Sequence, residues 1–380
     1  MASRATIPSL LAGTALLGLL ACGGSSSSGG STGSMNVHLV DGPIGGYQHV
    51  YLNIQQVQIH GPDGWTTLSS PNQTYDLLSL TNGISATLAN GATLPAGHYE
   101  QMRLILGSGN TVVLSDGSTH ALTVPSGMQT GVKLIVSFQV QAGTTEDVYI
   151  DFDAAHSIQV VQAGASDKYL LRPTVRAFDK LATGSVSGTL TDGSSQALAG
   201  AEVYAETLDG SGSPTLVRSA VTAADGSYTL DLLPTGGTYF IVSQPVTTTA
   251  SYNAKASAGF TISSSTPTYT WTTSFTPALA TGTATGTYAA PAGSDQSDTV
   301  DLIQTLPEGS TAAMGSFVIH SQIATVTPTG ESYTFTQVPT GDYTVRSTRS
   351  TLNADGSVTV ATPVTGTGTV TASGTLTVNF

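Results

Sequence analysis

Short runs in which apolar and polar residues alternate fill most of this chain, and they constrain its fold more than any other feature. Val50, Leu52 and Ile54 share one face of such a run, and the alternation changes phase at Gln55 and Gln56, which predicts a β-bulge there. Turn signals separate the runs at intervals of about 8–12 residues. The pattern predicts an all-β chain made of several antiparallel β-sandwich modules in tandem.

Two local features add detail to this pattern. Asp-Gly pairs at Asp116, Asp192, Asp225 and Asp355 are typical of hairpin turns. The segment Leu77–Ala89 suits a short helix.

The charge of the chain limits its partners. Acidic residues outnumber basic ones by 24 to 11, which gives a formal net charge of −13. We expect no nucleic-acid binding, because that requires many Lys and Arg side chains to neutralise phosphates. The single cysteine excludes a disulfide scaffold and a Cys-based zinc site. The hydrophobic fraction of 39% is nevertheless large enough for folded cores.

Residues 1–21 predict a lipoprotein signal peptide. Arg4 precedes an apolar stretch, Ile7–Ala21, that is shorter than the roughly 20 residues of a membrane-spanning helix. The stretch ends in Leu-Leu-Ala, and Cys22 follows. This sequence resembles the bacterial lipobox, and the resemblance implies that Cys22 is acylated. The alternative is an ordinary signal peptide with an incidental cysteine.

The residues after Cys22 predict a flexible tether. Positions 23–34 are all Gly, Ser or Thr, so residues 22–34 form a lipidated cysteine and a leash. Gly23 at the position after the cysteine resembles the signal for outer-membrane sorting. We therefore expect a bacterial cell-envelope protein that is held to the outer membrane by its acyl chains, facing either the periplasm or the exterior.

An internal repeat organises the C-terminal half. The segment Ala182–Leu190 recurs at Ala280–Tyr288, an offset of 98 residues, and Ser227–Leu230 recurs at Ser332–Phe335, an offset of 105 residues. The repeat predicts two related β-sandwiches, a second module at 182–279 and a divergent third module at 280–380. The alternative is coincidence in a Thr- and Gly-rich composition.

The second module resembles the carboxypeptidase regulatory-like (prealbumin-like) domain. The matching stretches are Gly184–Gly188, Leu198–Val203, Ala224–Leu230 and Leu233-Pro234. The third module has Thr-Gly-Glu in place of the Asp-Gly turn before Tyr333, so its match is weaker. The resemblance implies a spacer or adhesion sandwich, and some relatives belong to a carbohydrate-binding-like fold group.

The first module, residues 35–180, resembles the bacterial lipoprotein domain of unknown function 4382. The stretches that carry the resemblance run in order through Val37–Pro43, Val50–His60, Asp76–Leu80, Leu94–Tyr99, Val124–Gly127, Val148–Ala154 and Leu170–Pro173. The resemblance implies a β-rich surface lipoprotein and assigns no activity.

The strongest metal candidate is a row of aspartates. Alternation on one strand places Asp147, Asp151 and Asp153 on the same face. Carboxylate oxygens suit Ca²⁺, which would be the one cofactor. The interpretation we prefer is structural, a solvent-exposed face or ion pairs with Arg172 and Arg176, so we expect no cofactor and keep Ca²⁺ as the one candidate.

Two aromatic residues are the ligand-binding candidates. Tyr269 and Trp271 share a strand face and could stack on sugar rings, or they could face the core. No arrangement typical of a catalytic site stands out. We therefore expect a non-enzymatic, lipid-anchored envelope protein with a structural or adhesive role. The alternative is a carbohydrate- or ligand-binding surface lipoprotein, aided by Ca²⁺ and partnered by a glycan or an envelope protein.

Overall fold

A computed structural model gives the fold of the chain. It describes residues 31–41, 47–80, 84–114, 116–124, 131–152, 157–163, 166–171, 175–179, 183–293, 296–327, 330–352 and 358–380. Strands dominate these residues, which confirms the predicted all-β class. No helix in the described ranges is long and apolar enough to cross a bilayer.

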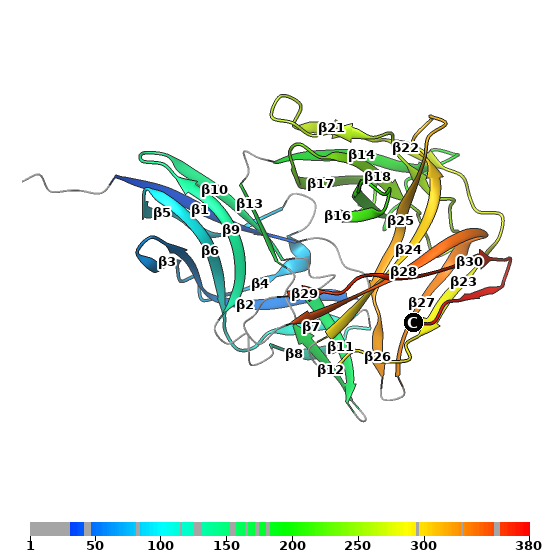
Figure 1. Cartoon of the computed structure of the whole chain (residues 1–380), viewed down its shortest axis with the longest axis horizontal. Helices are drawn as coiled ribbons and strands as arrows, with labels where there is room; N and C mark the ends of the chain where they lie inside the picture. Colours follow the sequence, from blue (N-terminus) through cyan, green and yellow to red (C-terminus); the bar gives the residue numbers. More distant parts are fainter. Residues whose placement is uncertain are drawn as a thin grey trace, which may run out of the picture. The chain divides into compact units, whose positions relative to one another are not determined.

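The first module is built from two sheets that enclose one core (Figure 1). Its strands are β1 (Thr32–Val40), β2 (Tyr47–Gly61), β3 (Gly64–Ser69), β4 (Gln73–Asp76), β5 (Ala86–Pro95), β6 (Gly97–Leu106), β7 (Thr111–Leu114), β8 (Thr119–Thr123), β9 (Val132–Val140), β10 (Thr145–Asp151), β11 (Ile158–Ala163), β12 (Ser166–Leu171) and β13 (Arg176–Asp179). One sheet has the order β13-β10-β1-β5. The other contains β9, β6, β2, β7, β8, β12 and β11, and it continues into the third module through a parallel bridge from β11 to β26 (Thr325–Thr327).

The long strand β2 shows how the alternation builds this core. Val50, Leu52 and Ile54 are fully buried, and the pairing of β2 with β6 shifts register between Ile54 and Gln56. The predicted bulge is therefore confirmed. It keeps the apolar side chains on the core face after the phase change.

Two local expectations need correction. The segment Leu77–Ala89 does not form the predicted helix. Leu77–Ser79 forms a short 3-10 helix, η1, and β5 begins at Ala86. The backbone of β5 forms its hydrogen bonds with β1 instead of within a helix. Thr32–Ser34, assigned to the tether from composition, lies in β1. Its backbone pairs with β5, and the amide of Ser34 donates to the carbonyl of Thr144 at 2.9 Å.

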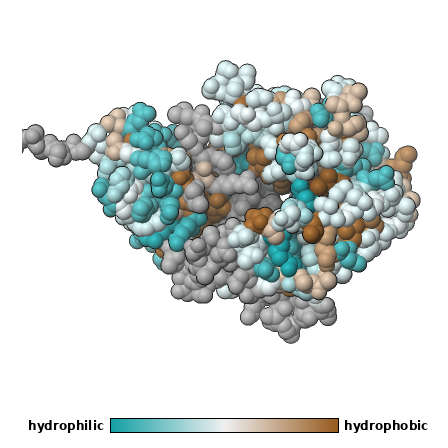
Figure 2. Space-filling model, viewed as in Figure 1, coloured by the Kyte–Doolittle hydropathy of each residue, from teal (hydrophilic) through white to brown (hydrophobic). Residues whose placement is uncertain are grey.

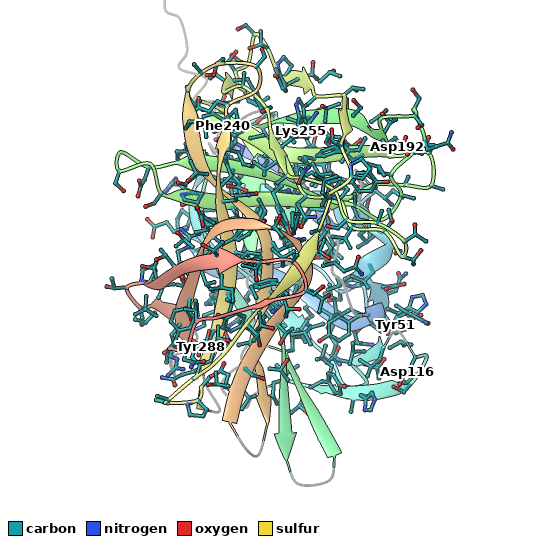
Figure 3. The ribbon with its side chains drawn as sticks, turned by 90° about the vertical axis from the view of Figure 1, so that its right-hand side faces the viewer. Tyr51, Asp116, Asp192, Phe240, Lys255 and Tyr288 are labelled. Carbon is teal, nitrogen blue, oxygen red and sulfur yellow. The ribbon has the colours of Figure 1, made fainter. Side chains whose placement is uncertain are left out.

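The Asp-Gly turns follow the prediction where they are described. Turns lie at Asp116, Asp192 and Asp225, and the first two project at the edge of the molecule in Figure 3. At Asp225 the carboxylate accepts from both the amide and the hydroxyl of Ser227, at 3.0 and 2.6 Å. Asp355 lies outside the described residues.

The second and third modules have the same strand topology. The strands of the second are β14 (Thr183–Asp192), β15 (Glu202–Leu208), β16 (Pro214–Val221), β17 (Ser227–Pro234), β18 (Thr238–Ser243), β19 (Lys255–Ala256), β20 (Phe260–Thr261), β21 (Thr268–Thr270) and β22 (Thr273–Phe275). Those of the third are β23 (Thr281–Thr287), β24 (Gln296–Pro307), β25 (Met314–Ile323), β26 (Thr325–Thr327), β27 (Gly330–Pro339), β28 (Gly341–Leu352), β29 (Val358–Val360), β30 (Val364–Val370) and β31 (Thr375–Thr377).

In each module the first strand has an antiparallel and a parallel neighbour: β14 lies between β17 and β21, and β23 lies between β27 and β31. In the facing sheet, β15 pairs with β16 and β18, as β24 pairs with β25 and β28. Thus β14, β17 and β21 belong to one sheet of the second module, and β16 and β18 belong to the other. This shared order is the topology that the sequence repeat predicts.

Buried polar contacts lock the second module to the third. Glu206 on β15 is fully buried, and its Oε2 accepts a hydrogen bond of 3.0 Å from the backbone amide of Val318 on β25. Burial raises the pKa of Glu206 well above its usual value. Arg346 on β28 donates to the carbonyl of Pro214 at 2.7 Å while it pairs with Asp301. These two contacts join the second and third modules directly.

The modules differ in their surfaces. The first carries 17 charged residues in 146 positions, and the other two together carry 17 in 200. Strongly hydrophilic residues gather over the first module in Figure 2, whereas the other surfaces are mostly pale. A binding site that depends on charged side chains is therefore expected at the first module or at its borders.

Candidate functional site

The aspartate strand predicted from sequence is β10, which lies beside β1 in parallel pairing. Asp147 is partly exposed and accepts a hydrogen bond of 2.8 Å from the side-chain amide of Asn36. Its carboxylate also lies 3.8 Å from Nε2 of His38, whose ring stacks on Tyr149 at a centroid distance of 4.7 Å. This end of the strand is a polar surface network.

Asp151, at the other end of β10, has a different environment. It is 4% exposed and forms an ion pair with Arg218 on β16 of the second module. The predicted ion-pair partners belong to the first module: Arg172 lies outside the described residues, and Arg176 is the backbone neighbour of Asp151 in β13. The Arg218 pair was missed because alternation along a strand does not reveal which module docks against it.

Asp153 lies outside the described residues. Within the parts of the chain that the structure describes, no three His, Cys, Asp or Glu side chains gather closely enough to hold a metal ion. Calcium binding by Asp147, Asp151 and Asp153 stays a prediction.

Arg218 is held rigidly at the border of the two modules. It is 9% exposed, and its Nε donates a hydrogen bond of 2.9 Å to the backbone carbonyl of Asp231 on β17. A guanidinium in such a position needs a charge partner, since an unpaired buried charge is costly. Asp151 supplies that charge. One sequence signal could have found this residue, because Arg218 is the only arginine between positions 177 and 345.

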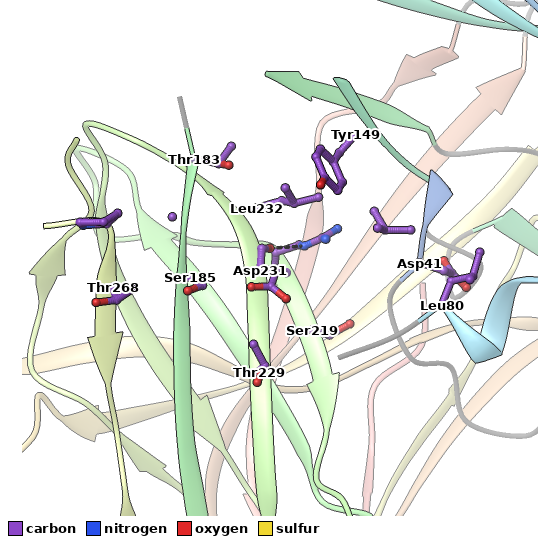
Figure 4. Close-up of a pocket in the computed structure, with 14 residues that line it drawn as sticks. Asp41, Leu80, Tyr149, Thr183, Ser185, Ser219, Thr229, Asp231, Leu232 and Thr268 are labelled. Carbon is purple, nitrogen blue, oxygen red and sulfur yellow. Dashed lines mark hydrogen bonds between the residues drawn. The ribbon is translucent and has the colours of Figure 1, made fainter. Parts of the chain in front are cut away.

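A cavity of about 330 Å³ opens beside Arg218 (Figure 4). The first module contributes the end of β1, Tyr149 of β10 and Leu80, and the second module contributes the sheet formed by β14, β17 and β21 together with β16. The lining residues are Val40, Asp41, Leu80, Tyr149, Thr183, Gly184, Ser185, Arg218, Ser219, Thr229, Asp231, Leu232, Pro267 and Thr268. The lining thus combines hydroxyls, carboxylates and one guanidinium with apolar side chains. Small-molecule sites also combine polar and apolar lining groups.

The predicted aromatic candidates lie on another face of the second module. Tyr269 and Trp271 are partly buried and pack against its core. The ring of Tyr269 stacks on Phe260 at 3.7 Å, and Trp271 meets Phe275 edge to face at 6.3 Å. Their packing is that of the core alternative, and sugar stacking on them stays a prediction. Cys22, the predicted lipidation site, lies outside the described residues.

Comparison with known families assigns two parts of the chain. The model of the domain of unknown function 4382 matches residues 32–173. The model of the carboxypeptidase regulatory-like domain matches residues 185–270. The chain carries the first of these domains followed by the second. The ion pair between Asp151 and Arg218 therefore joins a domain of unknown function 4382 to a carboxypeptidase regulatory-like domain.

Solved structures give only distant similarities. The Bacillus anthracis TIE protein is 14% identical with a TM-score of 0.22, and the match covers 92% of this chain but 50% of that one. The streptococcal ancillary pilin is 10% identical with a TM-score of 0.21, covering 91% and 98%. The major pilin subunit of Bacillus cereus is 11% identical with a TM-score of 0.16, covering 92% and 99%. These scores are too low to show a shared fold, and no curated protein matches the chain.

Proposed function

We propose that the chain is a non-enzymatic, lipid-anchored protein of the bacterial cell envelope, whose β-modules form a stiff structural or adhesive body. In this proposal Cys22 carries the acyl chains that hold the body to the outer membrane. The chain then presents its loops to the periplasm or to the exterior.

The observation that supports this role is the interlocking of the modules. The contact between Glu206 and Val318 and the contact between Arg346 and Pro214 join the second and third modules, and the ion pair between Asp151 and Arg218 joins the first and second. Each contact involves an ionisable side chain with little access to water, and separating the modules would remove one hydrogen bond or ion pair from it. Such joints resist bending, which suits a protein that transmits load from a membrane anchor.

The anchor is tested by acylation and fractionation. Cells that express the full chain take up labelled palmitate into it, and the protein sediments with outer membranes. The Cys22→Ser variant loses both the label and the sedimentation. If that variant is still labelled and still sediments with membranes, the proposed anchor is wrong. Protease treatment of intact cells then separates the periplasmic from the exterior orientation.

The cavity beside Arg218 favours a second candidate function, the binding of a small ligand. Its mixed polar and apolar lining is the supporting observation. Calorimetric titration of the purified Cys22→Ser chain with small molecules, with and without Ca²⁺, tests this role independently of the anchor. Binding that requires Ca²⁺ and is lost in Asp147→Asn would support the aspartate site instead of the cavity.

A further inference from the structure

We propose that the cavity beside Arg218 takes a neutral, polyhydroxylated ligand of the size of a single sugar ring. The inference rests on the second candidate function above and names its ligand class. It concerns the border between β1, β10 and the sheet of β14, β17 and β21, which differs from the face that carries Tyr269 and Trp271.

Size limits the ligand first. The cavity volume of about 330 Å³ lies at the lower end of the range of small-molecule sites, which is about 300–1,000 Å³. A single ring with its substituents suits such a volume, whereas an oligosaccharide does not fit inside it.

The hydroxyls of the wall define the chemistry. Ser185 on β14, Thr229 on β17, Thr268 on β21 and Ser219 on β16 all line the cavity (Figure 4). In the described ranges, no group forms a hydrogen bond with their side-chain hydroxyls. A hydroxyl both donates and accepts, and so does every hydroxyl of a polyol. These four positions can therefore exchange water for ligand hydroxyls without loss of hydrogen bonds.

Charge favours a neutral ligand over an anionic one. Arg218 is the one cationic side chain among the described lining residues, and its guanidinium already forms an ion pair with Asp151. A sugar acid or a phosphate would therefore meet no unpaired positive charge in the described lining to offset the loss of its hydration.

The apolar part of the lining completes the match. Leu80 and Leu232 are buried residues of the wall, and Pro267 is an exposed residue of the lining. The C–H faces of a sugar ring are apolar and gain from contact with such groups. A ligand with hydroxyls on its edge and C–H groups on its faces satisfies both kinds of wall.

The third module supplies a matched control. The repeat offsets place Thr334 at the position of Thr229, and Thr336 and Gln337 at those of Asp231 and Leu232. The hydroxyl of Thr334 is already used, since it donates to the carbonyl of Tyr333 at 2.8 Å. A change at Thr334 therefore alters the same fold position without touching the cavity.

The test uses calorimetric and ligand-observed NMR titration of the purified Cys22→Ser chain. The probes are glucose, galactose, mannose and N-acetylglucosamine as neutral sugars, glucuronate as an acid, and glucosamine as an amine. We expect at least one neutral sugar to bind and glucuronate not to bind. Thr229→Val and Ser185→Ala each weaken that binding by roughly tenfold, and Thr334→Val leaves it unchanged.

Three results would overturn the proposal. No binding of any neutral sugar removes the ligand class, and binding of glucosamine alone points to an ammonium ligand held by the carboxylates. Binding that is equally weakened by Thr334→Val, or by neither cavity variant, places the ligand elsewhere. An unchanged melting temperature of Thr229→Val shows that any loss of binding is not a loss of folding. None of these results affects the acylation of Cys22, so the anchor stands or fails separately.

Discussion

The hydroxyl of Tyr228 donates a hydrogen bond of 2.8 Å to the backbone carbonyl of Trp271. That carbonyl lies so close to Gly188 that a Cβ there would overlap its oxygen. The third module repeats the arrangement, because Tyr333 donates to the carbonyl of Val378 at 2.7 Å and the same carbonyl overlaps a Cβ built on Gly286. In each module, the repeated glycine leaves room for the last strand to approach the first strand closely. The repeated tyrosine then holds the last strand there by a hydrogen bond.

Tyr228→Phe should therefore destabilise the second module. Its ring stays buried, but the carbonyl of Trp271 loses a donor, and an incompletely satisfied buried polar group costs about 1–3 kcal/mol. Urea unfolding measures the loss. Tyr51→Phe, at the edge of the molecule in Figure 3, is the control and should change the free energy of unfolding little. Equal stability of the two variants would contradict the structural role of the Tyr228 hydroxyl.

The pair of Asp151 and Arg218 makes a second prediction. Arg218→Met removes the guanidinium that pairs with the buried carboxylate of Asp151 and should cost up to about 3–5 kcal/mol. The double variant Arg218→Met with Asp151→Asn should recover a substantial part of that loss, because the uncompensated charge is then gone. A double-mutant cycle by chemical unfolding measures the coupling, and strictly additive losses would show that the two side chains do not interact.

The sequence predicts those features that depend on residues close together along the chain. The bulge near Gln56, the turn at Asp225 and the repeated Gly188 and Tyr228 all depend on neighbours along a strand or on a repeat, so the sequence predicts them. The start of β1 at Thr32 could not be predicted, because Thr, Gly and Ser suit a tether as well as an edge of a strand.

The cavity was beyond prediction for a different reason. It forms where Tyr149 and Asp41 of one module meet Asp231 of another, and the docking of two modules leaves no periodic pattern. Only the isolation of Arg218 in an otherwise uncharged strand, β16, marked this place in the sequence.

Glu331 makes the stability of the third module depend on pH. Its Oε2 accepts a hydrogen bond of 2.6 Å from the amide of Ala292, and burial, followed by the nearby charge of Asp298, raises the pKa of Glu331 to about 7. The folded state therefore holds a proton that the unfolded state releases near its ordinary pKa of 4.5. Stability is fully present below about pH 4.5 and falls as pH rises through about 7, by up to about 1.4 kcal/mol per pH unit.

Glu331→Gln should remove this dependence, since an amide resembles the protonated acid. Urea unfolding at several pH values measures the slope in the variant and in the parent chain. Glu100→Gln is the control, because the side chain of Glu100 is 75% exposed. A slope that survives in Glu331→Gln would assign the titration to another group.

The interlocking of the second and third modules predicts an unusual result in limited proteolysis. Leu279 lies in the connection between β22 and β23 and is fully exposed, so chymotrypsin should cleave after it and Leu279→Ser should resist. The two fragments should still elute together in gel filtration under native conditions, because the contacts of Glu206 and Arg346 do not depend on the connection. Urea should separate them. Fragments that part without denaturant would mean that the connection alone holds the modules together, and the stiff body proposed for this protein would then be wrong.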